Sequence, residues 1–323
     1  MAKPIPTLLL VALPASGKSE VRRYLASLPA DQVADDFGLG PTVQLDDYPY
    51  VHLMRRISAE MRQLGEAPAF FASDALPFLE PADWGTLIHL VNEDYASLDD
   101  DADPRPASAA EWLLLRIDRA RDKVGLPSAL GTVSTSGRAA VGGAIEEDAR
   151  KLWSDRHDVM TQGRRRGATV VIEFARGGPE RTTPPIPDPR GYRYSLGQLS
   201  PEILATAAIL YVWVTPEESR RRNHERVRPG RAGDASILHH GVPETVMRQD
   251  YGIDDMMWLR DASDRPGTVR VAAGGITYHL PVAVFDNRND MTSFLRADRQ
   301  DWPDAAVAAL HGQLVQAFSS LHD

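Results

Sequence analysis

The stretch Thr7-Leu8-Leu9-Leu10-Val11-Ala12-Leu13-Pro14-Ala15-Ser16-Gly17-Lys18-Ser19 decides the fold of this chain. It opens with an apolar run that predicts a buried strand, continues through a loop of small residues, and ends on Gly17-Lys18-Ser19. From Lys18 to about residue 28 the pattern predicts a helix, which Pro29 stops. A strand, a tight loop and a helix N-terminus in this order bring successive backbone N–H groups together, where they can bind an anion.

The same stretch predicts a nucleotide site. Lys18 would bridge the β- and γ-phosphates, and the Ser19 hydroxyl would ligate Mg²⁺. Lysine is rare in this chain, since only Lys3, Lys18, Lys123 and Lys151 occur, so the motif lysine is not a by-product of lysine-rich sequence. The stretch resembles the phosphate loop of the P-loop NTPase superfamily, with Ala12 where glycine is commonest; patterns for the family also accept alanine. The alternative is an ordinary strand–turn–helix junction. The residues expected to contact the nucleotide are Leu13, Pro14, Ala15, Ser16, Gly17, Lys18 and Ser19.

Composition narrows the function classes. The chain has 323 residues and a formal net charge of -9, which argues against a general nucleic-acid binder because such proteins neutralise phosphates with a basic surface. The absence of cysteine excludes disulfides, thiolate metal sites and cysteine nucleophiles. The apolar run at the N-terminus is too short to span a membrane and lacks a signal-peptide cleavage site. We therefore expect a cytoplasmic protein without membrane association.

Five apolar segments predict the strands of an α/β fold: residues 7–12, 42–45, 168–174, 208–214 and 280–285. They are nearly continuous in aliphatic residues, as expected of parallel strands covered on both faces by helices. Residues 270–284, with Gly274-Gly275, predict a hairpin near the C-terminus. A last helix is expected over about 304–321. The prediction is a single P-loop kinase-like domain, residues 1–323, with a mainly parallel five-stranded sheet.

The interval between the second and third strands is too long for a simple crossover. It predicts a helical insertion over about residues 52–165, with helices at 52–64, 82–98, 109–124 and 144–162. The acidic, proline-containing stretch 99–106 and the small-residue stretch 132–143 are predicted to be connections. We expect this insertion to cover the substrate.

A pair of aspartates follows the second strand. Leu45-Asp46-Asp47-Tyr48 resembles the Asp-Asp-Phe-Tyr element of the uridine kinase and pantothenate kinase group and, more loosely, the post-strand aspartate of zeta-toxin-like kinases. The resemblance implies that Asp46 accepts the proton of the substrate hydroxyl. The alternative is that both aspartates start the loop and cap the helix. A Ras-type GTPase is disfavoured, because no lysine here follows an asparagine to form its Asn-Lys-x-Asp element.

Further charged residues follow the third, fourth and last strands. Glu173 lies near the end of the third strand, where P-loop proteins often carry an acid near Mg²⁺; alternatively it pairs with Arg176. Thr215, Pro216 and Glu218 predict the start of a helix. The arginine-rich run after them resembles the lid of nucleotide and nucleoside kinases, expected over about residues 216–250. The residues predicted to stabilise the transferring phosphate are Arg222 and Arg226, with a solvated basic helix as the alternative.

The sequence contains three weaker indications of function. Asn287 and Arg288 follow the last strand and could contact the base of a nucleotide, although turn chemistry explains them equally well. The adjacent pair His239-His240 is not expected to form a zinc site. A group of aromatic residues could line a base pocket, although core packing is the default interpretation: Tyr48, Tyr50, Phe70, Phe71 and Trp84.

Together these signals predict an ATP- and Mg²⁺-dependent phosphotransferase that moves the γ-phosphoryl group to a hydroxyl of a small molecule, such as a nucleoside or related metabolite. Its partners would be the nucleotide and the small-molecule acceptor. Two alternatives stay open. One is a zeta-toxin-like kinase that acts on a nucleotide-sugar or a macromolecule, and the other is a regulator that binds ATP without transferring phosphate.

Overall fold

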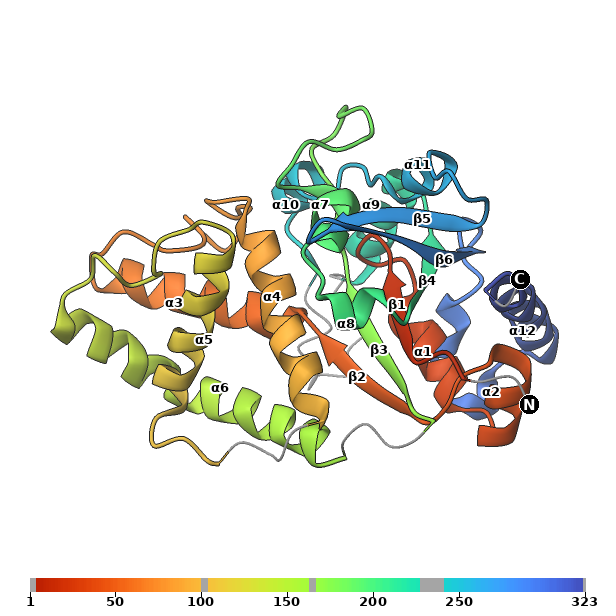
Figure 1. Ribbon diagram of the computed structural model, residues 1–323, viewed down its shortest axis with the longest axis horizontal. Coiled ribbons are helices and arrows are strands. Elements are labelled where there is room, and N and C mark those ends of the chain that lie inside the picture. The colour runs from red at the N-terminus through yellow and green to blue at the C-terminus, as the bar shows by residue number, and fades with distance from the viewer. Residues whose placement is uncertain (1–3, 100–103, 163–166, 227–240, 322–323) are drawn as a thin grey trace.

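The computed structural model describes residues 4–99, 104–162, 167–226 and 241–321. Its centre is a six-stranded sheet in the order β2-β3-β1-β4-β6-β5 (Figure 1). All neighbouring strands are parallel except β5, which pairs antiparallel with β6. The strands are β1 (Thr7–Val11), β2 (Thr42–Asp46), β3 (Thr169–Phe174), β4 (Ala207–Trp213), β5 (Thr268–Ala273) and β6 (Ile276–Asp286).

The α/β class and the mainly parallel sheet are confirmed, but the strand count of five is wrong. The arm of the expected hairpin that precedes Gly274-Gly275 joins the sheet as its sixth strand, β5. Its side chains alternate between buried and exposed positions, because an edge strand of this kind packs on one face only. Selecting strands by continuous apolar runs therefore missed it.

Helices cover both faces of the sheet, as predicted. On one face, Leu9, Ile172 and Ile209 pack in a core with residues of α4, α7, α8 and α11. On the other, Leu8 and Leu210 pack with residues of α1, α2 and α12. These helices are α1 (Lys18–Ala26), α2 (Ala30–Phe37), α4 (Asp83–Ala96), α7 (Gly191–Gly197), α8 (Pro201–Leu204), α11 (Met256–Asp261) and α12 (Asp304–Ser319).

Among the described residues, four α-helices lie between β2 and β3: α3 (Tyr48–Gln63), α4, α5 (Ala109–Lys123) and α6 (Thr135–Gln162). They project from one side of the sheet (Figure 1) and share a hydrophobic core of their own. α4 belongs to both cores, because Ile88 and Val91 face the sheet while Leu87 and Leu90 face the other inserted helices. The insertion is therefore joined to the sheet by a continuous apolar contact.

The prediction that residues 132–143 form a connection is wrong, because α6 begins at Thr135 and includes most of them. Glycines in a helix interior lower its intrinsic stability, and this stretch contains Gly137, Gly142 and Gly143. Tertiary packing overrides that cost. Val141 is fully buried in the insertion core, and a Cβ on Gly142 would lie 3.9 Å from the Ala110 Cβ of α5, so the small residues let the two helices approach closely.

The remaining helices follow β4 and β6. α9 (Pro216–Arg226) starts as predicted, with the Thr215 hydroxyl accepting a hydrogen bond from the Glu218 N–H at 3.2 Å. The others are α10 (Glu244–Gln249) and the short 3-10 turns η3 (Ser293–Arg296) and η4 (Arg299–Asp301). One more 3-10 turn, η1 (Ser97–Asp99), directly follows α4 in the insertion. Among the helices that the structure describes, none combines the length and apolar character needed to cross a membrane.

Candidate functional site

The loop between β1 and α1, residues 12–17 and here named the β1–α1 loop, takes a tight turn at the carboxyl edge of the sheet. Ala15 and Gly17 both have positive φ angles, of 56° and 105°, and α1 starts directly after Gly17. A Cβ on Gly17 would lie 2.5 Å from the Thr292 hydroxyl, so only glycine fits there. The Lys18 ammonium folds back over the loop and donates to the Ala12 carbonyl at 3.3 Å.

Side chains from two segments distant in sequence donate hydrogen bonds to carbonyl groups of this loop. Ser219 of α9 donates to the Pro14 carbonyl at 2.7 Å. The Asn287 amide, which follows β6, donates to the Ser16 carbonyl at 2.6 Å. Arg222 links the two segments, since its guanidinium donates to the Asn287 carbonyl at 2.5 Å. We name Ser219, Arg222 and Asn287 the loop brace.

The loop brace changes the expected roles of two residues. Arg222 is only 1% exposed and does not line the cavity described below, so the prediction that it reaches a transferring phosphate is not met in this structure. Its Nε instead donates to Glu218 at 2.6 Å. Asn287 is fully buried and is therefore not placed to touch a base. Helix periodicity puts Arg222 and Arg226 on one side of α9, but only tertiary contacts show that the first of them faces the protein interior.

Replacing Asn287 by alanine tests the loop brace. Asn287→Ala removes the donor to the Ser16 carbonyl and the acceptor for the Met291 N–H, at 2.7 Å, and an unsatisfied buried polar group costs about 1–3 kcal/mol. We expect a lower melting temperature and roughly tenfold weaker ATP binding by calorimetry. Asn92→Ala is the matched control, because Asn92 also makes two such bonds, to Gln198 and Ser200. Equal loss of ATP affinity in both variants would contradict a role in shaping the loop.

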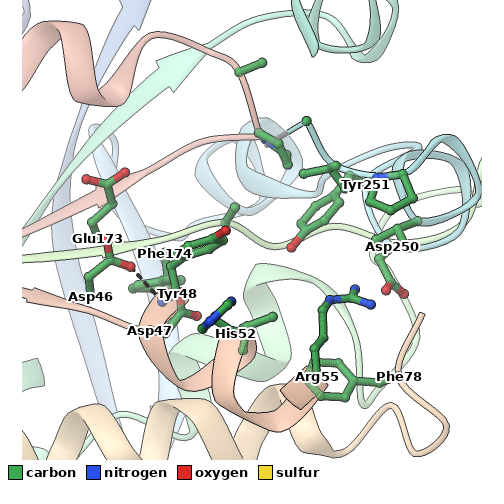
Figure 2. A pocket seen from close by; sticks show the side chains of 18 of the residues that line it. Asp46, Asp47, Tyr48, His52, Arg55, Phe78, Glu173, Phe174, Asp250 and Tyr251 are labelled. Atoms are coloured by element: carbon green, nitrogen blue, oxygen red, sulfur yellow. Dashed lines mark hydrogen bonds between the residues drawn. The ribbon is translucent and has the colours of Figure 1, made fainter. Parts of the chain in front are cut away.

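A cavity of about 620 Å³ opens beside the β1–α1 loop, a volume typical of small-molecule sites. Its loop end is formed by residues 14–19 together with Asp46, Asp47 and Glu173. Its aromatic end is formed by Arg55, Phe71, Phe78, Trp84, Asp250 and Tyr251. Figure 2 shows the two acids Asp46 and Glu173 on one side of the cavity and Arg55 with Asp250 on the other.

The carboxylates of Asp46 and Glu173 lie next to each other because β2 and β3 pair in parallel with these residues in register. Residues in register on adjacent parallel strands point to the same face. Burial, followed by the charges of Glu173 and Asp47, raises the pKa of Asp46 to about 7. Glu173 is neutralised by Arg22 of α1 at 2.5 Å, and not by Arg176. Asp46 also accepts a bond from the Tyr48 N–H at 2.8 Å, so it marks the start of α3 as well.

Asp47 forms a buried ion pair with Arg176, whose Nη1 lies 2.6 Å from the Asp47 carboxylate. The guanidinium is 1% exposed, donates to the Ser195 hydroxyl at 2.9 Å, and packs against the Trp84 ring with 4.8 Å to its centroid. Burial raises the pKa of Asp47, and the charge of Arg176 opposes that shift. This pair joins the N-terminus of α3 to the segment that follows β3, and so fixes the position of the neighbouring Asp46.

Breaking this pair should destabilise the fold. Asp47→Ala leaves the Arg176 guanidinium buried without its carboxylate, and removing one partner of a buried ion pair costs about 3–5 kcal/mol. Urea denaturation should show that loss in the free energy of unfolding. The double variant Asp47→Ala with Arg176→Met should recover part of it. A loss below about 1 kcal/mol in Asp47→Ala would contradict a structural role for the pair.

Positive charge gathers at the loop end of the cavity. Burial lowers the pKa of Lys18, partly opposed by the charges of Glu173 and Asp46. Arg226, at the end of α9, also lines the cavity and lies 3.6 Å from the Glu20 carboxylate. Burial is likewise the main cause that lowers the pKa of Arg226. A buried lysine and a partly buried arginine at one end of the cavity favour an anionic ligand there.

The other predicted residues divide between the cavity and the core. Ser19, Tyr48, Phe71 and Trp84 line the cavity. Tyr50 and Phe70 are buried in the insertion core, as the default interpretation had it. Arg288 does not line the cavity and instead pairs with Asp286 at 2.7 Å. His239, His240 and the lid residues 227–240 lie outside the described residues.

Several residues of the site were not predicted from the sequence. Arg22 is one helical turn beyond Lys18, a spacing that could have indicated that both face the cavity edge. Arg176, two residues after the end of β3, was considered only as a partner of Glu173. Arg55 belongs to α3, whereas Asp250 and Tyr251 follow α10 almost 200 residues later, so only the tertiary fold brings them to one cavity.

Comparison with known proteins adds no identification. Neither the models of protein families nor the curated proteins contain a match to this chain. Within the described part of the chain, no group of three or more His, Cys, Asp and Glu side chains could hold a metal ion. Mg²⁺ in nucleotide sites needs no such group, because it is held by one or two protein oxygens, phosphates and water.

Proposed function

We propose that the protein is a phosphotransferase that binds ATP with Mg²⁺ at the loop end of the cavity and transfers its γ-phosphoryl group to a hydroxyl of an acceptor bound towards the aromatic end. The observation that carries the proposal is the placement of Asp46, with a pKa raised to about 7, in one cavity with Lys18 and the β1–α1 loop. A base near neutral pKa beside an anion-binding loop is what phosphoryl transfer requires.

The β1–α1 loop has the features of a phosphate site. The carbonyl groups of Pro14 and Ser16 accept hydrogen bonds from Ser219 and Asn287, which do not line the cavity. The other side of this part of the loop faces the cavity. The Ser16 hydroxyl is buried without a hydrogen-bond partner among the described residues, and a phosphate oxygen would satisfy it. Lys18 and Arg226 supply the charge that phosphate oxygens require.

The magnesium ion fits the same end of the cavity. The Ser19 hydroxyl and the Glu173 carboxylate are the oxygen groups that would hold it or its water ligands, while Arg22 neutralises Glu173 in its absence. When bound, Mg²⁺ would offset negative charge on the transferring phosphate. The remaining requirement is positioning, since phosphoryl transfer depends mostly on alignment and charge stabilisation.

The chain's own residues carry out the transfer in this proposal. Asp46 accepts the proton from the acceptor hydroxyl as that oxygen forms a bond to the γ-phosphorus. The bond between the γ-phosphorus and the oxygen that bridges it to the β-phosphate breaks, and ADP leaves with that oxygen. Lys18 and Arg226 stabilise the charge on the phosphate oxygens during the step. Asp46 then returns its proton to solvent.

Transfer can be tested by incubating the protein with ATP, Mg²⁺ and a panel of hydroxyl-bearing metabolites, and by detecting phosphorylated products by mass spectrometry. We expect a product with at least one small-molecule acceptor and none with the Asp46→Asn variant. Product with only a protein, RNA or nucleotide-sugar would contradict the small-molecule acceptor. Tight ATP binding with no product from any acceptor would favour a nucleotide-dependent regulator.

A further inference from the structure

Two charged side chains at the aromatic end of the cavity face each other without forming an ion pair. Arg55 extends from α3 and Asp250 follows α10, and both point into the same part of the cavity (Figure 2). Among the described residues, the cation within ion-pair distance of Asp250 is Arg190, at 3.8 Å. A space between Arg55 and Asp250 is therefore bordered by one positive and one negative group.

Both groups are shielded from water, Asp250 almost completely and Arg55 in part. Asp250 is 2% exposed, and burial raises its pKa to about 6. Burial also lowers the pKa of Arg55. Charged groups in such surroundings gain from any ligand that restores the hydrogen bonds lost to water.

The Arg55 guanidinium is held in a fixed orientation. One face lies over the Phe71 ring, 3.9 Å from its centroid. Its Nη1 donates to the backbone carbonyls of Asp74 and Leu76, at 2.9 and 3.4 Å. The Nε and Nη2 donors make no hydrogen bond within the described structure, so a preoriented pair of donors is left for a ligand.

Aromatic rings form the rest of this end. Phe78 packs edge-to-face on Trp84 with centroids 4.9 Å apart, and Trp84 packs in the same way on Tyr251 at 5.8 Å. These contacts make one continuous aromatic wall beside Arg55 and Asp250. Such a wall favours a planar or apolar ligand group over a hydrated ion.

α3 sets the distance between the two ends of the cavity. Asp47 precedes its first residue, Tyr48, and Arg55 comes eight residues after Asp47 in the sequence. At a rise of 1.5 Å per residue, this separation is about 12 Å along the helix. His52, one turn before Arg55, lines the cavity between the ends. An acceptor that touches both Asp46 and Arg55 must therefore be elongated.

We propose that the acceptor is an elongated alcohol whose far end is an uncharged, planar amide-type group. Its hydroxyl lies at Asp46, its carbonyl oxygen accepts hydrogen bonds from Arg55, and its N–H donates to Asp250. This inference rests on the proposed function for the identity of the reacting hydroxyl, but the recognition at the aromatic end is a separate, measurable property.

The opposite charges of the two residues select against charged end groups. A carboxylate or phosphate would pair with Arg55 but would be repelled by Asp250. An ammonium group would pair with Asp250 but would be repelled by Arg55. An amide edge presents an acceptor beside a donor and has no net charge, so it satisfies both residues at once.

Four alcohols that differ at one end provide the test: 6-hydroxyhexanamide, 6-hydroxyhexanoate, 6-aminohexan-1-ol and the zwitterion 6-hydroxynorleucine. Binding to the wild-type protein is measured by NMR titration in the presence of a non-hydrolysable ATP analogue and Mg²⁺. We expect the amide to bind at least tenfold more tightly than each of the others. Preference for the acid, the amine or the zwitterion overturns the proposal, and so does no measurable binding of the amide at 10 mM.

Charge-removing variants give a readout that loss of structure cannot imitate. Asp250→Asn should bind 6-hydroxyhexanoate about tenfold more tightly than wild type, because the repelling carboxylate is gone. Arg55→Gln should gain affinity for 6-aminohexan-1-ol in the same way, and Arg55→Lys should lose affinity for the amide because it lacks the planar fork. Unchanged selectivity in these folded variants would overturn the proposal.

Arg138→Gln and Asp261→Asn are the matched controls, since both residues lie outside the cavity and pair with Glu111 and Arg260 respectively. They should keep wild-type selectivity. Binding and transfer are scored separately: amide-selective binding without phosphorylation would refute the proposed phosphotransferase and leave this inference standing. Phosphorylation without a preference for the amide would support the phosphotransferase and refute this inference.

Discussion

Asp46→Asn should abolish phosphoryl transfer while leaving the protein folded and able to bind ATP. Loss of a general base lowers a rate by about 10²–10⁴-fold, and the asparagine can still accept the bond that Asp46 accepts from the Tyr48 N–H. The measurement is kcat with the acceptor identified from the metabolite panel, together with ATP affinity from calorimetry. Transfer at more than a third of the wild-type rate would show that another group is the base.

The same substitution should stabilise the protein at alkaline pH. The pKa of Asp46 in the folded chain is about 7, against an ordinary value of 3.8, so the folded state binds this proton more tightly than the unfolded state does. Its stabilising contribution is complete below about pH 4 and is lost as the pH rises through 7. Asp46→Asn should therefore melt higher than wild type at pH 8 and equally at pH 4. Equal melting temperatures at both pH values would contradict the shifted pKa.

The pKa of Asp46 also determines how activity should change with pH. A protonated carboxyl cannot accept a proton, so kcat/KM for the acceptor should rise as the pH increases through about 7 and then level off. Glu173 and Asp47 contribute to the raised pKa, so Glu173→Gln should move the rise to lower pH. A profile that falls over this interval would contradict Asp46 as the base.

Lys18→Met should weaken ATP binding by about a hundredfold, a change of roughly 3 kcal/mol. The Lys18 ammonium is buried at the loop end of the cavity, and burial lowers its pKa more than the charges of Glu173 and Asp46 raise it. A bound phosphate would replace the weak contact to the Ala12 carbonyl, at 3.3 Å, with charge-assisted hydrogen bonds. Calorimetric titration with ATP and Mg²⁺ measures the loss.

Lys151→Met is the matched control for Lys18. Lys151 is an exposed lysine of α6, paired with Asp155 at 2.7 Å, and does not line the cavity. The Lys151→Met variant should bind ATP with the affinity of the wild-type protein. Because Lys18→Met removes a desolvated charge, it should also be at least as stable as wild type without nucleotide. Equal affinity of the two variants for ATP would remove Lys18 from the nucleotide site.

The sequence predicted the framework of the site well. The five predicted strands all occur. β1, β3 and β4 are compact apolar runs buried on both faces, whereas β2 alternates between buried and exposed residues and β6 begins at Ile276, four residues before the predicted start. Asp46 and Glu173 could be placed at one sheet edge, because parallel strands end together there. Strand β5 was predicted only as one arm of a hairpin and not as a strand of the sheet, because its one-sided burial gives an alternating pattern. The start of α6 was missed because helix packing overrides the weak helix propensity of its glycines.

Contacts between distant segments could not be predicted. Nothing local distinguishes Arg222, which braces the β1–α1 loop through Asn287, from Arg226, which lines the cavity. Both are arginines on one side of α9, and only the position of the segment after β6 decides which one is buried. The pairing of Glu173 with Arg22 and of Asp47 with Arg176 depends in the same way on how α1 and α3 pack on the sheet.

The most direct test of the account is a titration of the ¹⁵N-labelled protein with a non-hydrolysable ATP analogue and Mg²⁺, followed through the backbone amide signals of Gly17, Lys18 and Ser19. If the β1–α1 loop holds the phosphates, these signals should shift more than others and saturate at one equivalent of nucleotide. Saturable binding that leaves these three amides unmoved, or no binding at millimolar nucleotide, would contradict the account.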